Sequence, residues 1–391
     1  MKKRIFIFSW IIPKGGLPKV MLKEYQYLKQ HNESASILTM VPIPEAYISE
    51  FRNSETYECL SKRKDKQKKT DLSGFFPGIR ISMSGSVLSN IVGVNQCLLE
   101  KKPTAVIAHQ LSSALLITPY CFFFRKPFIL ILHDNPFLFM TQKNTQGLSL
   151  RKKFLNNLVY LVSNLTILLS RSTICTTAQI KNALKSNLAI KKTPLVADYG
   201  IDIFPETDIK ERTLLLTVSK WSKFRRPRAY LDLIKFLPPG IKLTMVGRWD
   251  TEEEMNEFKE EVNNLGLADR IILKSDISEE ELYDMYNKTK IFLRLGFNES
   301  GTGQAILEAI GHGCPVVISK GLGASELIEN GREGYIVDES DLQGVAECIQ
   351  KMFTNDVMVS EMSEASYRLA KSHSWNEYLD KVHRALIKDI V

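Results

Sequence analysis

Apolar runs of strand length alternate along this chain with amphipathic segments of helical period, a pattern typical of parallel α/β sheets. The runs fall into two series. The first comprises Arg4–Ser9, Ser36–Val41, Thr104–His109, Phe128–His133, Arg171–Thr176 and Pro194–Ala197. The second comprises Leu214–Ser219, Lys242–Gly247, Arg270–Leu273, Ile291–Leu295, Pro315–Ser319 and Gly334–Val337. The pattern predicts two Rossmann-like, doubly wound domains facing a cleft, because open parallel sheets bind ligands at the carboxyl ends of their strands.

The segment between the two series sets the domain limits. Tyr199–Arg212 carries Pro205 and several charges and has no periodicity, which indicates a linker. We predict an N-terminal domain over 1–200, a linker over 201–212 and a C-terminal domain over 213–370.

Composition agrees with a folded, soluble chain of this size. Its 391 residues suggest two to three domains. The chain has 44% hydrophobic residues, 25% charged residues and a mean hydropathy of −0.12, values typical of folded proteins. Ile5–Ile12 is too short to span a bilayer, so we interpret it as part of a buried strand. The six cysteines are scattered without a C-x-x-C pair, which indicates neither a zinc site nor a disulfide framework and favours a cytoplasmic location.

The net charge of +8 is distributed unevenly along the chain. Residues 1–200 hold 28 basic and 11 acidic side chains, a net charge of +17, against −9 in the remainder. An anionic partner of the N-terminal half is therefore expected: a lipid surface, an acidic glycan or nucleic acid. Nucleic acid is disfavoured, because the basic blocks Lys62–Lys69 and Arg151–Lys153 contain no interleaved aromatic residues and no nucleic-acid-binding motif accompanies them. A solvated surface loop explains Lys62–Lys69 equally well.

The segment Phe154–Leu169 helps to distinguish a lipid surface from the other anionic partners. It is apolar at many positions and follows the basic Arg151–Lys153, as in an amphipathic helix that rests on anionic lipid. A helix packed between a sheet and solvent shows the same pattern. With the charge asymmetry, this favours reversible attachment to the cytoplasmic face of a membrane.

The most informative chemistry lies in Arg294–Gly313, which follows an apolar run that predicts a buried strand. Gly301 and Gly303 allow the backbone to approach a ligand closely, and the helix predicted over Gln304–Ile310 directs its first amides toward that ligand. Glu299 and Glu308 flank the turn and supply acceptors for sugar hydroxyls. A nucleotide diphosphate with a sugar attached fits this arrangement.

A second candidate site segment follows the strand predicted at Leu214–Ser219. Lys220–Arg228 places five cations within nine residues, where Lys220 and Arg226 could neutralise a departing diphosphate. A solvent-exposed basic turn is the alternative. We favour ligand binding, because cations are unfavourable near a helix N-terminus unless an anion is present.

The N-terminal half offers two weaker candidates. Gly15 and Gly16 precede a helix that begins near Pro18 and would admit a phosphate or a sugar. His109 and His133 end two predicted strands. His133 is the stronger candidate for hydrogen bonding to a sugar, with Asp134 setting its tautomer; a structural histidine is the alternative.

These residues together carry a family resemblance. The C-terminal half resembles the retaining family 4 glycosyltransferases of GT-B fold (glycosyltransferase group 1): a strand with a basic loop, a strand ending in glycine, and a paired-glutamate motif. Those elements are Leu216–Arg226, Thr244–Arg248 and Glu299–Ser319. Further matching elements are Gly15-Gly16, His133, Tyr199–Asp202, Ala324–Val337 and Ser374-Trp375.

The resemblance implies a donor site and a reaction. Lys220 and Arg226 would bind the donor diphosphate, and Glu308 the ribose hydroxyls. Glu299 would bind the donor sugar and phosphates together with the turn Ser300, Gly301, Thr302, Gly303 and Gln304. The implied reaction moves a sugar, with retention, from a nucleotide-diphosphate sugar to a hydroxyl of a glycan or lipid-linked acceptor. A last helix, roughly 371–391, would return to the first domain.

Two departures from the family pattern leave alternatives open. Eight residues separate Glu299 from Glu308 where the family has seven, so either Ser300 fills the first glutamate position or the turn is expanded by one residue. Lys220 replaces an arginine, and Arg226-Pro227 replaces lysine-glycine.

The chain has no Asp-x-Asp motif, so no metal and no other cofactor is expected. A catalytically silent partner subunit and a nucleotide-sugar epimerase of the same fold remain the alternative functions.

Overall fold

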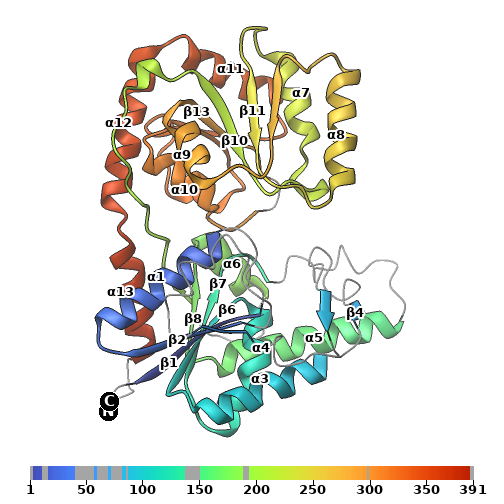
Figure 1. The fold of residues 1–391 in the computed structure, drawn as a ribbon, viewed down its shortest axis with the longest axis vertical. Helices are drawn as coiled ribbons and strands as arrows, with labels where there is room; N and C mark the ends of the chain where they lie inside the picture. The colour runs from blue at the N-terminus through green and yellow to red at the C-terminus, as the bar shows by residue number, and fades with distance from the viewer. Residues whose placement is uncertain are drawn as a thin grey trace. The chain divides into compact units, whose positions relative to one another are not determined.

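The structure is a computed structural model. It describes residues 3–10, 16–39, 57–59, 69–71, 82–84, 87–136, 150–187, 193–296 and 299–387, and only the backbone at 57–59, 69–71, 82–84, 87–89 and 150–156. The chain forms two compact units, one of residues 1–198 with 377–391 and the other of residues 199–376. Figure 1 shows that each unit is built around its own sheet with helices against it.

The first unit contains a parallel sheet in the order β3-β2-β1-β6-β7-β8-β9. Its strands are β1 (Arg4–Ser9), β2 (Ser34–Thr39), β3 (Tyr57–Cys59), β6 (Ala105–His109), β7 (Phe128–Leu132), β8 (Ser172–Cys175) and β9 (Leu195–Val196). The six predicted strands are confirmed to within two residues at each end. β3, which the sequence pattern did not predict, extends the sheet by pairing with β2.

Helices connect these strands and cover the sheet. They are α1 (Gly16–Gln30), α3 (Val87–Lys101), α4 (Leu111–Phe123), α5 (Leu150–Leu169), α6 (Ala178–Asn187) and α13 (Trp375–Ile387), whose residues from 377 on belong to this unit. A separate antiparallel pair is formed by β4 (Lys69–Asp71) and β5 (Ser82–Ser84). No helix among the described residues is long and apolar enough to cross a membrane.

The second unit contains a parallel sheet in the order β12-β11-β10-β13-β14-β15. The strands are β10 (Leu214–Val218), β11 (Leu243–Val246), β12 (Ile271–Lys274), β13 (Thr289–Arg294), β14 (Val316–Ser319) and β15 (Gly334–Val337). All six were predicted. The order reverses between β10 and β13, and such a switch point is where doubly wound sheets bind ligands.

Local signals explain where the helices of this unit begin. The helices are α7 (Arg228–Phe236), α8 (Glu252–Asn264), α9 (Glu279–Asn287), α10 (Gln304–Gly311), α11 (Leu342–Phe353) and α12 (Asp356–Ser372). Thr251 and Ser278 cap α8 and α9 by accepting from the backbone N–H three residues later, and three glutamates occupy each first turn. Such carboxylates stabilise the positive end of the helix dipole.

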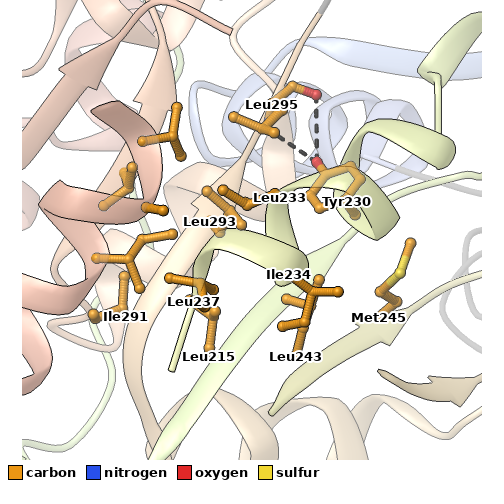
Figure 2. Close-up of a cluster of buried hydrophobic side chains, with 14 of the residues drawn as sticks. Leu215, Tyr230, Leu233, Ile234, Leu237, Leu243, Met245, Ile291, Leu293 and Leu295 are labelled. Atoms are coloured by element: carbon orange, nitrogen blue, oxygen red, sulfur yellow. Dashed lines mark hydrogen bonds between the residues drawn. The ribbon is translucent and has the colours of Figure 1, made fainter. Parts of the chain in front are cut away.

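The core of the second unit joins the central strands to α7. Leu215, Leu243 and Ile291 from the sheet pack with Leu233 and Ile234 of that helix (Figure 2). Tyr230 is fully buried, accepts from the backbone N–H of Leu295 at 3.0 Å and lies 3.3 Å from its carbonyl oxygen. The helix thereby fixes the chain where it leaves β13, just before the glycine-rich turn.

The segment predicted as a linker packs within the second unit. Arg212 is 2% exposed and donates to Thr207 and Tyr367, and Phe204 stacks on His312 with ring centroids 3.8 Å apart. At the start of the segment, a Cβ on Gly200 would lie 2.3 Å from the backbone of Trp375. The contact leaves no room for a side chain at position 200. The two family-like elements Tyr199–Asp202 and Ser374-Trp375 therefore pack directly against each other. The chain re-enters the first unit at Glu377, slightly later than predicted.

Candidate functional site

Two loops meet at the carboxyl edge of the second sheet. The basic loop, Lys220–Arg226, follows β10, and the glycine turn, Glu299–Gly303, follows β13, its neighbour in the sheet. The Arg225 guanidinium forms an ion pair with the Glu299 carboxylate. The sequence prediction that these segments share a site is supported by this direct contact.

Trp221 anchors the basic loop. Its side chain is fully buried and its indole N–H donates to the carbonyl of Val246 at 3.0 Å, while its backbone N–H donates to the carbonyl of Arg248. The end of β11 supports the loop at a second point, since Gly247 has φ +129° and its Cα faces the Ser219 carbonyl. The loop backbone is therefore held on two strands.

The cations of this loop differ in their surroundings. Lys220 is largely exposed and pairs with Asp250 at 2.8 Å. Arg225 is only 35% exposed in its side chain and reaches Glu299, whereas Arg226 is exposed. Arg225, which sequence reasoning passed over, is thus the arginine that the structure brings to the glycine turn.

The backbone of the basic loop differs between Arg225 and Arg226. Lys223–Arg225 forms a 3₁₀ turn, and Arg226 ends it in the left-handed region at φ 46°, ψ 58°. Glycine is the residue that adopts this conformation without strain. Arg226 thus stands at a position that suits glycine, directly after Arg225.

Glu299 is clasped by two arginines. Arg294 at the end of β13 donates from one guanidinium nitrogen to both carboxylate oxygens at 2.9 Å, and Arg225 supplies the second ion pair. Arg294 is 6% exposed, and this residue was also missed as a site residue. The sequence did contain a signal for Arg294, because it ends an apolar strand. A charged side chain at such a position is buried only when it has a partner.

Buried donors without a partner lie in this region. Within the described part of the chain, neither the Nη1 of Arg294 nor the side-chain amide nitrogen of Gln304 has a hydrogen-bond partner. Unmade hydrogen bonds of buried donors are costly, so such donors indicate an acceptor that binds there. Anionic or hydroxyl oxygens would meet this need.

The helix after the turn adds further donors. The N-cap residue of α10 is Gly303, with φ 72° and ψ 96°, so no side chain caps the helix. Its first amides are therefore available to an anion together with the helix dipole. Ser300 and Gly301 are half-buried, and Thr302 is buried.

Glu308 lies in the second turn of α10. Its Oε2 accepts from the Tyr286 hydroxyl at 3.3 Å. Burial, reinforced by Glu308 and other neighbours, raises the pKa of Tyr286 well above 10, so this hydroxyl keeps its proton and remains a donor. The carboxylate is half-buried and oriented by a neutral partner.

The candidates of the first unit give a different result. Gly15 lies outside the described residues, and Gly16 is the first residue of α1. His109 ends β6 and His133 follows β7, as predicted. The two rings are joined at 2.8 Å, His109 Nδ1 to His133 Nε2, so His109 is a hydrogen-bond partner of His133.

Comparison with known proteins supports the interpretation of the second unit. Residues 202–369 match the family described as glycosyl transferases group 1. The chain is 24% identical over 156 residues to a poly(glycerol-phosphate) alpha-glucosyltransferase of Bacillus subtilis, and 26% identical over 118 residues to a mannosylfructose-phosphate synthase of Agrobacterium fabrum. These alignments cover 39% and 30% of this chain. They span only 22% and 26% of the lengths of the two relatives.

A solved structure is similar over nearly the whole chain. The crystal structure of Anabaena Alr3699/HepE in complex with UDP and glucose superposes with a TM-score of 0.75, covering 98% of both chains at 15% identity. At this identity the likeness establishes the fold. It confirms the predicted pair of Rossmann-like domains.

Proposed function

We infer that this chain is a group 1 glycosyltransferase of GT-B fold, which moves a sugar from a nucleotide-diphosphate sugar to a hydroxyl of a glycan or lipid-linked acceptor. The observation that carries the proposal is the glycine turn. Its uncapped helix N-terminus, the clasped carboxylate of Glu299 and the unpartnered donors of Arg294 and Gln304 lie at the switch point of the second sheet. This set suits a ligand with both phosphates and hydroxyls.

Each group has a distinct role in this proposal. Arg225 and Lys220 neutralise the donor diphosphate, with Arg226 reassigned to holding the loop conformation. The amides from Ser300 to Gln304 bind phosphate and sugar oxygens, and Glu308 accepts from the ribose hydroxyls. Glu299 orients the sugar and keeps Arg225 at the site in the absence of a ligand.

The reaction needs no carboxylate nucleophile. The bond between the anomeric carbon and the phosphate oxygen breaks, and the acceptor oxygen forms its bond on the same face. The acceptor proton passes to the departing phosphate oxygen, so atoms and charges balance and the configuration is retained. The protein contributes positioning and stabilisation of the negative charge that develops on the diphosphate.

No metal is required in this proposal, because cationic side chains and amides perform the charge stabilisation. Transfer should therefore continue at an unchanged rate in excess EDTA. A loss of transfer that added Mg²⁺ or Mn²⁺ restores would overturn this part of the proposal.

A membrane surface is proposed as the location of the acceptor. α5 exposes a stripe of apolar side chains, with Leu161 64%, Leu165 49% and Leu168 44% exposed. These positions recur at helical spacing on one face, and the half that contains them carries the excess basic charge. The protein would bind reversibly to anionic lipid at the cytoplasmic face.

Liposome pelleting with and without anionic lipid tests the membrane proposal. Leu161→Glu together with Leu165→Glu should abolish pelleting without affecting donor binding, since both side chains are exposed. Leu265→Glu together with Ile272→Glu, at exposed apolar positions of the second unit, provides a control with the same change in charge and in type of side chain. Pelleting that is independent of lipid charge, or unchanged in the leucine variant, would refute it.

One experiment separates the candidate functions. A thermal-shift panel of UDP-, GDP- and ADP-sugars identifies the donor, because a ligand that binds only the folded protein raises its melting temperature. Incubation of that donor with acceptor glycans or glycolipids should then give a glycoside with retained configuration. Epimerised donor without acceptor would indicate an epimerase, and binding without turnover a silent subunit. The absence of any shift would overturn the donor site itself.

A further inference from the structure

Exposed apolar side chains are concentrated on three neighbouring helices of the first unit. α3, α4 and α5 bury one side in the same core cluster, and α4 packs against both of the others. Large apolar side chains are nevertheless exposed on α3 (Val92 and Leu99), at the end of α4 (Phe122, Phe123 and Phe124) and on α5 (Leu158, Leu161, Val162, Leu165 and Leu168). Exposed apolar side chains on adjacent helices are typical of a surface that binds a partner.

These three helices end at the same edge of the sheet. They lead into β6, β7 and β8, which are neighbouring parallel strands. The amino ends of such strands lie together, so the three connections from helix to strand lie side by side. Leu99, Phe122–Phe124 and Leu168 occupy the last turns of their helices and therefore gather at this amino edge. The carboxyl edge, where doubly wound sheets bind their ligands, lies at the opposite ends of the strands.

The connection between α4 and β7 is rich in phenylalanine. Phe122, Phe123 and Phe124 are 59%, 76% and 51% exposed. Phe122 and Phe123 meet edge to face with 5.5 Å between ring centroids, and Phe124 lies against buried Tyr120 at 5.1 Å. Successive residues at a helix end point about 100° apart, so the three rings spread around the end of α4. A protein packed against one face of the helix would leave some of them in water, whereas fluid acyl chains can surround all three.

Cations follow the apolar side chains at two of these connections. Lys102 precedes β6, and Arg125 and Lys126 precede β7. None of the three forms an ion pair with another residue in the described part of the chain, and Glu100 is the single acidic residue of α3, α4 and α5. This combination suits the phosphates of an anionic lipid surface. A symmetric contact with a second copy of the chain would instead place like charges opposite each other.

Two of these cations adopt a backbone conformation that favours glycine. Lys102 has φ 48° and Arg125 has φ 51°, each just after its helix. After α4, the backbone N–H of Lys126 donates to the Cys121 carbonyl at 2.9 Å and that of Arg125 to the Phe122 carbonyl at 3.3 Å. The left-handed position of this C-terminal motif is usually glycine. A cation costs stability there, which indicates that the charge serves a function at this edge.

We propose that the amino edge of the first sheet inserts into the surface of an anionic lipid bilayer, with Phe122–Phe124 among the acyl chains. Lys102, Arg125 and Lys126 bind the headgroup phosphates. This rests on the membrane attachment in the proposed function, and it assigns that attachment to a definite edge of the first unit. Leu168 of α5 meets the bilayer beside the phenylalanines, and the carboxyl edge of the sheet stays open to ligands.

A tryptophan placed among the three phenylalanines measures the insertion. The full-length Phe123→Trp variant is bound to vesicles of phosphatidylcholine and phosphatidylglycerol whose acyl chains are brominated. Bromine should quench the added fluorescence, relative to the wild-type protein, because position 123 lies among the chains. Phe236→Trp, at a phenylalanine of the second unit that is 53% exposed, is the matched control and should show no added quenching. Equal quenching in both variants, or none in either, would overturn the proposal.

Lys102→Gly together with Arg125→Gly separates lipid binding from folding. Glycine relieves the left-handed conformation, so the melting temperature should rise while the affinity for the anionic vesicles falls by about tenfold or more. Lys242→Gln together with Lys259→Gln removes two exposed cations of the second unit and should keep the affinity within about twofold. Equal losses in the two double variants, or equal binding to pure phosphatidylcholine, would overturn the proposal.

Replacement of all three phenylalanines by serine tests the other possible occupants of this surface. The variant should lose vesicle pelleting, and both it and the wild-type protein should sediment as the same species without lipid. A wild-type dimer that dissociates in the serine variant would mean that a second copy covers the phenylalanines, and would overturn the proposal. Unchanged pelleting of the serine variant would overturn it as well and leave the attachment to α5. Failure of the transferase proposal would be recognised separately, as the absence of any thermal shift with nucleotide sugars in the wild-type protein.

Discussion

Replacement of Arg225 by methionine tests which arginine of the basic loop binds the donor. Methionine keeps much of the side-chain volume and removes the charge. The loss of one charge-assisted contact with the diphosphate should weaken binding by about 1.5 to 3 kcal/mol, or about 10- to 150-fold in Kd. Arg226→Met is the matched control, since its side chain is exposed next to the same site, and its effect should be below about threefold.

The structure also indicates how Arg225→Met should affect folding. Glu299 keeps both hydrogen bonds from Arg294 at 2.9 Å, so the carboxylate is not left unpaired. The side chains of Arg225 and Glu299 are 35% and 17% exposed, and a partly solvated ion pair contributes about 1 kcal/mol or less. The melting temperature should therefore change little while donor affinity falls.

Isothermal titration with the nucleoside diphosphate of the identified donor measures this effect. Titrations at two salt concentrations add a second reading, because the loss of a cation should reduce the salt dependence of binding. If Arg226→Met weakens binding as much as Arg225→Met, or more, the reassignment based on the left-handed conformation of Arg226 is wrong.

Three further predictions concern single positions. Arg226→Gly should raise the free energy of unfolding by about 0.5 to 1 kcal/mol in urea titrations, because glycine adopts φ 46° without strain; destabilisation would contradict this. Gly247→Ala should cost more than about 2 kcal/mol in the same assay, since its Cβ would lie 1.8 Å from the Ser219 carbonyl oxygen at φ +129°; a neutral effect would show that the loop contact is wrong. Burial raises the pKa of Cys175 and of Cys314 to about 12, so at pH 8 both are protonated, and mass spectrometry should find them unmodified after iodoacetamide treatment of the native protein and modified after denaturation.

The alternation of apolar runs determined the strands and the class of fold. The central strands exist because runs of four to six mostly apolar residues are buried in a parallel sheet on both faces, as at Phe128–Leu132, where every side chain is buried. The short strand Tyr57–Cys59 escaped prediction because three residues are too few to show a period.

The glycine turn was likewise readable from the sequence, since glycines, flanking carboxylates and a following helix lie close together along the chain. Glu24 could have been found in the same way, as a charge among buried residues at helical spacing. Its hydrogen-bond partners, His109 on β6 and Tyr378 on α13, could not, because they lie 85 and 354 residues away along the chain.

The tertiary structure alone decided which side chains meet. The sequence offered five cations within Lys220–Arg228 and singled out Lys220 and Arg226, whereas the structure pairs Arg225 with Glu299. Residue type and spacing determine local conformation through backbone and burial preferences. Partners are decided by the crossing of strands and helices from distant parts of the chain, and that information appears only once the sheet order brings β10 beside β13 and β6 beside β7.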